Sequence, residues 1–226
     1  MKINDLRKNL DFYIPNPKCE LNYTKDYELL IAVMLSAQCT DKRVNEVTPN
    51  LFKYTLMELA HLDIKVLEKL IRPLGSYHKK SVFIKDDAKI LLEKYNGIVP
   101  NDRKKLESMP GIGRKCSNVI LSELFNIPTI AVDTHVERVS KRLGLVSQKD
   151  TVYGVEQKLL KTFKKDEYNK INHQLLLFGR YYCKAKNPLC DNCKMNCKFK
   201  QLKKCLKAFF FSLAQYLYYH LFYHLR

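Results

Sequence analysis

The chain has 226 residues, with 40 Lys and Arg against 23 Asp and Glu, so its formal net charge at pH 7 is +17. This length can bury a hydrophobic core without disulfides, which excludes a stapled miniprotein, and it is too short for two large independent domains. The basic residues are spread along the sequence, which favours a polyanionic partner. Abundant lysine from an AT-rich genome is the alternative explanation of the charge.

The N-terminal residues, from Met1 to Leu6, mix charged side chains with isolated apolar ones. They lack an apolar stretch followed by small residues, so we expect no export signal and an intracellular protein. Apolar residues that favour helices then run almost without interruption from Tyr27 to Ala37. This run is too short to span a bilayer and too long for a typical strand, so it predicts a buried core helix.

Further helices are predicted between turn signals such as Asn96-Gly97 and Met109-Pro110-Gly111. Their predicted ranges are 42–54, 64–71, 79–95, 103–108, 115–125, 136–144, 153–163 and 169–182. The alternation typical of strands is almost absent, so the predicted class is all-α. We expect no contact with a membrane for residues 1–202.

The segment 203–226 differs from the rest, because the stretch from Ala208 to Leu225 is uncharged and carries eight of the protein's 25 aromatic residues. Three hypotheses fit it: a helix that touches a membrane, a helix that docks on a partner, or appended sequence from altered reading of AT-rich DNA. Its role stays unknown.

A glycine-containing turn, Met109-Pro110-Gly111-Ile112-Gly113, lies between two predicted helices. Glycine permits the backbone angles and close approach that such a turn needs, and the free N–H groups at the start of the second helix form a site for a phosphate. A purely structural turn is one alternative. A dinucleotide-binding loop is another, although the segment before the turn is helical rather than a strand and Cys116 occupies the third glycine position.

A second pattern lies from Ile127 to His135. Here a mostly apolar stretch is followed directly by a carboxylate, a hydroxyl and an imidazole. Asp133 stands 18 residues after Lys115. The alternative is that Asp133 or Thr134 only caps the following helix.

From Glu20 to about Lys200 the sequence resembles endonuclease III, a helix-hairpin-helix DNA glycosylase. The segments that carry the resemblance are LLIAVMLSAQCTD (29–41), NGIVPNDRKKLESMPGIGRKCSNVIL (96–121), PTIAVDTHVERV (128–139) and FGRYYCKAKNPLCDNC (178–193). The resemblance implies a helix-hairpin-helix glycosylase fold with two helical lobes and a groove between them. The lobe with the hairpin would span 20–130, and the second would combine 1–19 with 131–202 and hold an iron–sulfur cluster loop.

The resemblance also implies a bifunctional DNA glycosylase and DNA-(apurinic or apyrimidinic site) lyase of base excision repair. Lys115 matches the lysine that attacks the sugar and forms a Schiff base, and Asp133 matches the assisting carboxylate. Similar adenine-removing glycosylases carry a different residue at the lysine position, so the expected substrates are oxidised pyrimidines. His135 is a candidate for orienting this loop, and a core histidine is the alternative.

The expected partner is double-stranded DNA with a damaged base or abasic site, bound by a monomeric, cytoplasmic, nucleoid-associated protein. The family fills the gap left by the displaced base with a Gln, matched by Gln38, and with an apolar residue from a second loop. Ser76 stands where that second loop usually has Leu. One hypothesis is that Tyr77 or His78 takes the place of this Leu, and the other is that displacement of bases from intact duplex DNA is weakened. Gly111, Gly113 and Arg114 are the expected DNA contacts of the hairpin.

Five cysteines crowd into one C-terminal stretch, and four of them are the expected metal ligands: Cys183, Cys190, Cys193 and Cys197. Four thiolates in this spacing suit either zinc or a [4Fe–4S] cluster. The resemblance implies the cluster, but the family's fourth cysteine position holds Phe199, so Cys197 is the expected fourth ligand and Cys205 its substitute.

Lysines surround these cysteines, and Lys184 and Lys186 are candidates for binding a DNA phosphate; ordinary solvated lysines are the alternative. Cys19, Cys39 and Cys116 are expected to be small packed residues rather than ligands. The alternative function is a non-catalytic DNA-binding or redox-sensing helix-hairpin-helix protein, a hypothesis based on Ser76 and the altered cysteine spacing.

Overall fold

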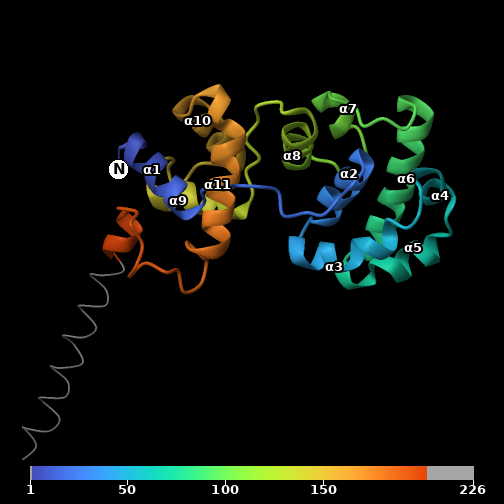
Figure 1. Cartoon of the computed structure of the whole chain (residues 1–226), viewed down its shortest axis with the longest axis horizontal. Helices are drawn as coiled ribbons and strands as arrows, with labels where there is room; N and C mark the ends of the chain where they lie inside the picture. Colours follow the sequence, from blue (N-terminus) through green and yellow to red (C-terminus); the bar gives the residue numbers. More distant parts are fainter. Residues whose placement is uncertain (1, 203–226) are drawn as a thin grey trace, which may run out of the picture. The chain divides into compact units, whose positions relative to one another are not determined.

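The structure is a computed structural model that describes residues 2–202, so the C-terminal segment discussed above lies outside the described residues. The described chain is helical and contains no strand, which confirms the predicted all-α class. The helices have the following bounds: α1 (Ile3–Tyr13), α2 (Asp26–Leu35), α3 (Asp41–Leu51), α4 (Leu56–His61), α5 (Ile64–Ile71), η1 (Arg72–Leu74), α6 (Tyr77–Tyr95), α7 (Arg103–Glu107), α8 (Arg114–Phe125), α9 (Thr134–Leu143), α10 (Val152–Thr162), η2 (Lys165–Glu167) and α11 (Tyr168–Tyr181) (Figure 1).

Each helix predicted from the sequence corresponds to an observed one, with ends that differ by a few residues. The prediction missed α1 and α4, and it did not resolve the short 3₁₀ helices η1 and η2. Within residues 2–202 no helix combines the length and the apolar character needed to cross a membrane.

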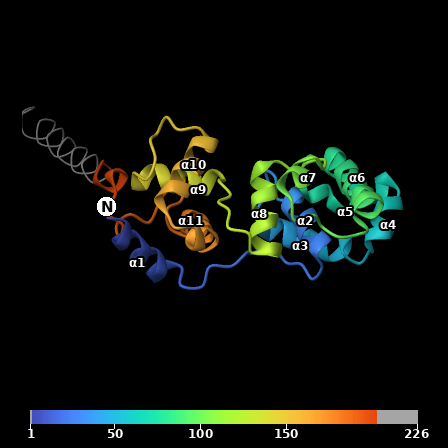
Figure 2. The same cartoon turned by 90° about the horizontal axis from the view of Figure 1, so that it is seen from above.

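The chain divides into two compact units, whose helices can be followed in Figures 1 and 2. Among the described residues, unit 1 comprises 2–17, 132–162 and 174–202, and unit 2 comprises 18–131 and 163–173. Helix α11 therefore contributes its first residues to unit 2 and the rest to unit 1.

Helix α2 forms the centre of unit 2, as its uninterrupted apolar sequence predicts. Every side chain from Leu29 to Leu35 is at most 1 % exposed. Helices α3, α6 and α8 pack against α2, so its apolar residues meet apolar residues from several sides. Burial on all sides explains why α2 lacks the polar face of a surface helix.

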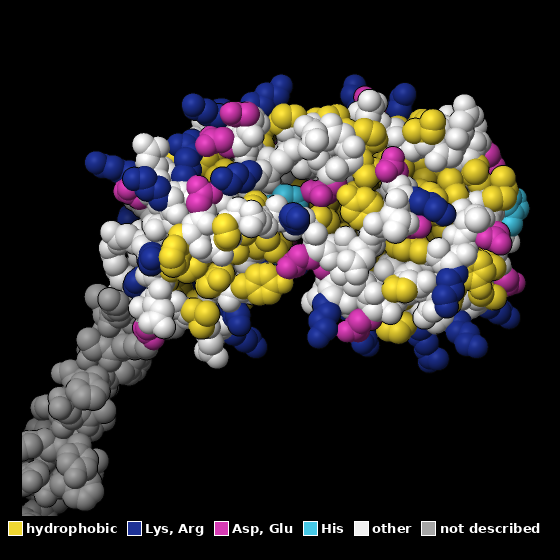
Figure 3. All heavy atoms as spheres, viewed as in Figure 1, with side chains coloured by type: hydrophobic (Ala, Val, Ile, Leu, Met, Phe, Trp, Pro, Cys, Tyr) yellow, Lys and Arg dark blue, Asp and Glu magenta, His cyan; other side chains and the backbone are white. Residues whose placement is uncertain are grey.

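Basic side chains lie over both units in the view of Figure 3, with Asp and Glu among them. This distribution agrees with the even spread of Lys and Arg along the sequence. It also means that the charge alone does not locate a binding site.

An unusual polar group lies in the core of unit 2. The Asp87 side chain on α6 is 0 % exposed, and neither of its carboxylate oxygens has a hydrogen-bond partner in the described part of the chain. Burial, with a smaller contribution from the neighbouring charge of Asp86, raises the pKa of Asp87 to about 8. The folded protein therefore holds a proton on this carboxyl near neutral pH.

Because the pKa of Asp87 is higher in the folded than in the unfolded chain, its favourable contribution is complete below about pH 4 and is lost as the pH rises through about 8. Replacing Asp87 by Asn removes this titration. Between pH 5 and pH 9 the ionisation of Asp87 lowers the free energy of unfolding of the wild type by about 4 kcal/mol, and we expect Asp87→Asn to lack this loss. Urea unfolding at both pH values measures this, with Glu93→Gln, which changes an exposed carboxyl on the same helix, as the control. An unchanged pH dependence in Asp87→Asn would contradict the account.

Candidate active site and cysteine loop

The glycine turn between α7 and α8 forms the predicted helical hairpin in unit 2. Gly111 has φ +75°, and a Cβ atom there would lie 2.7 Å from Cδ2 of Phe83 and 3.0 Å from Cγ of Met34. Only glycine fits this position, because the turn packs directly on α2 and α6. Gly113, in contrast, is exposed, and a Cβ atom added there would meet no other atom within 4 Å. The hairpin thus has one tightly packed glycine and one open glycine.

Helix α8 begins immediately after Gly113, which provides no side-chain cap. The first backbone N–H groups of a helix have no acceptor within the helix, and they carry its positive dipole end. An anion near Gly113 could therefore accept hydrogen bonds from these groups. This is the geometry that the hairpin motif predicts.

Lys115 lies in the first turn of α8 and is half-buried. Its amine makes no hydrogen bond or ion pair within unit 2. Its positive charge lies close enough to Cys19 to affect that thiol: burial raises the pKa of Cys19 to about 11, the charge of Glu123 adds to the rise, and the charge of Lys115 opposes it. Within unit 2, Lys115 is thus a primary amine without a polar partner beside the hairpin.

The segment that leads to Asp133 is held by a buried side chain of α8. Asn118 is 1 % exposed; its amide donates to the carbonyl of Ile130 at 2.9 Å and accepts from Arg103 Nη2 at 2.7 Å. The Thr129 hydroxyl donates to the backbone carbonyl of Asn118 at 2.7 Å. The backbone N–H of Ala131 donates to Asn172 Oδ1 at 3.0 Å. The backbone from Thr129 to Ala131 is therefore fixed by hydrogen bonds to α8 and α11.

Asp133 is the N-cap residue of α9 in unit 1, as the structural alternative predicted. One oxygen, Oδ1, accepts from the backbone N–H groups of His135 at 2.9 Å and Val136 at 2.8 Å. The other oxygen, Oδ2, has no hydrogen-bond partner within the described residues of unit 1. Capping therefore uses one carboxylate oxygen and leaves the second available, so the two hypotheses for Asp133 are compatible.

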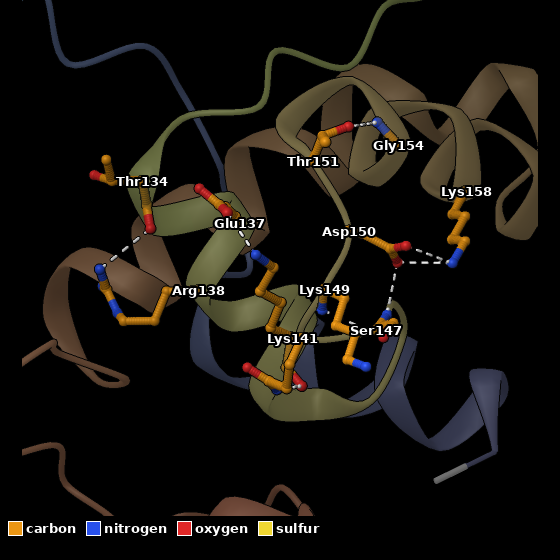
Figure 4. Close-up of polar contacts among 11 residues, drawn as sticks. Thr134, Glu137, Arg138, Lys141, Ser147, Lys149, Asp150, Thr151, Gly154 and Lys158 are labelled. Carbon is orange, nitrogen blue, oxygen red and sulfur yellow. Dashed lines mark hydrogen bonds and ion pairs between the residues drawn. The ribbon is translucent and has the colours of Figure 1, made fainter.

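The body of α9 carries polar contacts on its surface (Figure 4). Arg138 Nη1 donates to the carbonyl of Thr134 at 3.3 Å, and Lys141 pairs with Glu137 at 2.6 Å. In the loop that follows, Asp150 accepts from the backbone N–H of Ser147 at 2.7 Å. These contacts keep the helix behind Asp133 regular and its loop ordered.

His135 is part of the packing of unit 1. Its Nδ1 lies 3.2 Å from Nη2 of Arg138, and a Cβ atom on Gly179 would lie 3.0 Å from the His135 Cβ. Gly179 thus lets α11 approach α9 closely. These contacts favour the core-histidine interpretation.

The four predicted cysteine ligands line one hollow in unit 1, together with apolar side chains. All of the described cysteines are free thiols. The lining includes Leu143, Phe178, Leu189 and Met195 beside Cys183, Cys190, Cys193 and Cys197. Among residues 2–202 no three His, Cys, Asp or Glu side chains are gathered closely enough to hold a single metal ion.

Two arginines of α9, which the sequence analysis did not identify, hold the start of the cysteine loop. Arg138 Nε donates to the Cys183 carbonyl at 3.1 Å, and Arg142 Nη1 donates to the Lys184 carbonyl at 2.7 Å and lies 3.5 Å from Cys183 Sγ. Arg142 also stacks on the ring of Phe199, with 4.0 Å between the guanidinium carbon and the ring centroid. The sequence contained one signal for this pair: Arg138 and Arg142 are four residues apart in a predicted helix, so both side chains lie on the same face of that helix.

The remaining predicted site residues lie on exposed loops. Lys184 and Lys186 are exposed at the beginning of the cysteine loop. Gln38, after α2, and Ser76, before α6, are exposed and have left-handed backbones with φ +57° and +46°. The predicted hairpin residues and Gln38 belong to unit 2, whereas Asp133 and the cysteines belong to unit 1. Cys19, Cys39 and Cys116 pack against the core of unit 2.

Comparison with known proteins gives consistent matches. Residues 31–165 match the family model described as HhH-GPD superfamily base excision DNA repair protein. Endonuclease III of Bacillus subtilis (strain 168) is 45 % identical over 183 residues, which cover 80 % of this chain and 84 % of the relative.

Two solved structures resemble the chain over 90 % of its length and 99 % of theirs. One is a trapped endonuclease III–DNA covalent intermediate (TM-score 0.86, 43 % identity), and the other is a non-covalent endonuclease III–DNA complex (TM-score 0.87, 42 % identity). The chain therefore belongs to the HhH-GPD superfamily of base excision DNA repair proteins and, within it, to the endonuclease III family.

Proposed function

We propose that this protein is a bifunctional DNA glycosylase and abasic-site lyase that removes oxidised pyrimidines from double-stranded DNA in base excision repair. The observation that carries the proposal is the amine of Lys115, which has no polar partner within unit 2 and lies in the first turn of α8, directly after the hairpin turn. A relative that shares 43 % of its residues was solved as a covalent intermediate with DNA, which supports covalent chemistry. The same matches do not favour the non-catalytic alternative.

The chemistry assigned to Lys115 proceeds through its neutral amine, which attacks C1′ of the displaced nucleotide. The bond between C1′ and the base breaks, and the base leaves with the electron pair and takes up a proton. Loss of a proton from nitrogen and opening of the sugar give a Schiff base. Removal of a C2′ proton then expels the 3′ phosphate with the C3′–O electron pair, and hydrolysis restores the amine.

Asp133 is assigned the stabilisation of positive charge on the sugar and the transfer of protons. Its Oδ2 atom is available for this role, since Oδ1 alone caps α9. On the DNA side, the open backbone at Gly113 and the N–H groups of Arg114 and Lys115 would bind a phosphate. Gln38 would occupy the space of the displaced base.

The cysteine loop is assigned a [4Fe–4S] cluster held by Cys183, Cys190, Cys193 and Cys197. The four thiols line one largely apolar hollow, which fits the group. Zinc would need all four sulfurs about 2.3 Å from one ion. A [4Fe–4S] cluster takes one cysteine sulfur per iron, and the match to the endonuclease III family favours it over zinc. The bound cluster would fix the shape of a loop whose lysines, Lys184 and Lys186, are exposed and would contact a DNA phosphate.

The function is tested by borohydride trapping on duplex DNA that contains one thymine glycol. The wild-type protein should form a covalent complex, and Lys115→Gln should form none and should cleave abasic sites at least about 10³-fold more slowly. The steep salt dependence of DNA binding should be the same in both proteins, because the phosphate contacts remain. Lyase activity that survives in Lys115→Gln would refute the assignment of the nucleophile.

The dual role of Asp133 is tested by two substitutions. Asn caps helices as well as Asp does, so Asp133→Asn should unfold within about 0.5 kcal/mol of the wild type, whereas Asp133→Ala should lose about 1 kcal/mol. Both should lower the single-turnover rate of base release about 100-fold, because both remove the charge. A wild-type rate for Asp133→Asn would show that capping is the only role of this residue.

The cluster is tested by metal analysis of protein purified without oxygen. We expect about four irons and four sulfides per chain, lost in Cys197→Ser and retained in Cys205→Ser. One zinc per chain in place of iron would overturn the assignment of the metal. Retention of iron in Cys197→Ser together with its loss in Cys205→Ser would overturn the assignment of the fourth ligand.

A further inference from the structure

Two exposed loop tips of unit 2 share an unusual backbone. Gln38, between α2 and α3, and Ser76, between η1 and α6, both lie in the left-handed region, although neither is a glycine. Such a conformation costs of order 1 kcal/mol or more and persists where surrounding contacts impose it. The contacts that hold these two loops must therefore offset the cost of this backbone conformation.

A single buried ammonium group lies behind both tips. Lys80, in the first turns of α6, is 5 % exposed, and its Nζ donates to the carbonyls of Leu35 at 2.9 Å, Ala37 at 2.9 Å and Leu74 at 3.0 Å. Leu35 and Ala37 precede Gln38, and Leu74 precedes Gly75 and Ser76. Each of the three N–H donors of the lysine has one acceptor, so its hydrogen-bonding capacity is filled.

These three bonds link Leu35 and Ala37, which lead into the Gln38 tip, to Leu74, which leads into the Ser76 tip. No hydrogen bond joins the loop 36–40 directly to the loop 75–76 in the described part of the chain. Helices α2 and α6 themselves pack together (Figure 1), so the ammonium connects the ends of two elements that are already neighbours. The loop tips extend outward from this point and are exposed.

The stability of the fold does not by itself explain why a lysine is buried at this position. It has no carboxylate partner within residues 2–202, and burial lowers its pKa, as expected for a charge removed from water. An apolar side chain of similar size would avoid that desolvation cost, although the three carbonyls would then need other donors. Part of the compensation comes from the negative dipole end of α2, where Leu35 is the last residue.

We propose that Lys80 is a positioning residue that holds the Gln38 tip and the Ser76 tip at a fixed spacing, so that both enter duplex DNA together on either side of one displaced nucleotide. The proposal rests on the proposed function, since it takes the Gln38 loop to contact DNA. It also explains how a loop with Ser at its tip can open duplex DNA. The rigid placement of the tip takes the place of the bulk that a large apolar side chain would supply. Lys80 acts through the loops and contacts no reacting atom.

The first part of the experiment measures the tether itself by amide hydrogen exchange on the full chain. Lys80→Met keeps an unbranched side chain but removes all three donors. Lys85→Met is the matched control, because Lys85 lies on the same helix and donates one bond, to the Leu62 carbonyl at 2.8 Å. Exchange in peptides covering 36–40 and 75–80 should be at least about 10-fold faster in Lys80→Met and unchanged in Lys85→Met. Unchanged exchange in Lys80→Met would overturn the tether.

The second part compares two substrates. Thymine glycol in a duplex requires displacement of a base, whereas an abasic site in single-stranded DNA does not. Lys80→Met should lose about 10- to 100-fold in kcat/KM on the duplex and less than about 3-fold on the single strand. An equal loss on both substrates, or no loss on either, would overturn the positioning role. Inactivity of the wild type on both would refute the proposed function instead, while the exchange experiment would still decide on the tether.

Lys80→Arg provides the test if Lys80→Met fails to fold. Arg keeps the charge, but its planar guanidinium cannot reproduce the three-way arrangement of an ammonium group. It should show the same preferential loss on the duplex, with a smaller magnitude. Wild-type exchange and a wild-type ratio of the two activities in Lys80→Arg would count against the proposal.

Discussion

The hydrogen-bonding requirement of one buried amide, that of Asn118, determines how the sequence around Lys115 is arranged. A buried side-chain amide without partners costs several kcal/mol, so Asn118 must satisfy its donors and acceptor locally. It does so with Arg103 from α7 and with the carbonyl of Ile130. The same residue thus connects both helices of the hairpin with the segment that continues to Asp133. Lys115 stands three residues before Asn118 on α8, so the helix that carries the nucleophile also holds that segment.

Other polar side chains perform the same task elsewhere in the molecule. Lys80 joins two loops of unit 2, and Arg138 and Arg142 hold the cysteine loop of unit 1 to α9. In each case the acceptors are backbone carbonyls at helix ends or in loops, which have no partner within a helix. Asp87 is different, because it is buried without a partner in the described part of the chain and is kept neutral instead. Asp87 holds no loop in place, and above neutral pH its burial lowers the free energy of unfolding.

The helices were predictable because glycine, proline and capping residues mark their ends clearly. Helix α4 was missed even though Thr55 and Glu58 form a capping box, since its six residues are too few to show a helical period. Helix α1 was missed because its sequence is mostly polar, and only Leu6 and Leu10 are fully buried. The core role of α2 followed directly from its apolar sequence.

The site residues could be predicted only as types in a pattern, with roles taken from the resemblance. The sequence could not show that Asp133 caps with one oxygen and leaves the other available, because this depends on the geometry of one loop. Nor could it distinguish Lys80 from the lysines around it, since Lys79 and Lys80 are neighbours and only one is buried. Burial of a charge depends on how α2 and α6 pack, which involves residues far apart in the chain.

The central claim, that Lys115 is the group that bonds to the sugar, is tested most directly by peptide mapping of the borohydride-trapped complex. After digestion, mass spectrometry should find the DNA-derived adduct on the peptide that contains Lys115, with the neighbouring lysines unmodified. An adduct on another lysine, or on the N-terminal amine, would contradict the account.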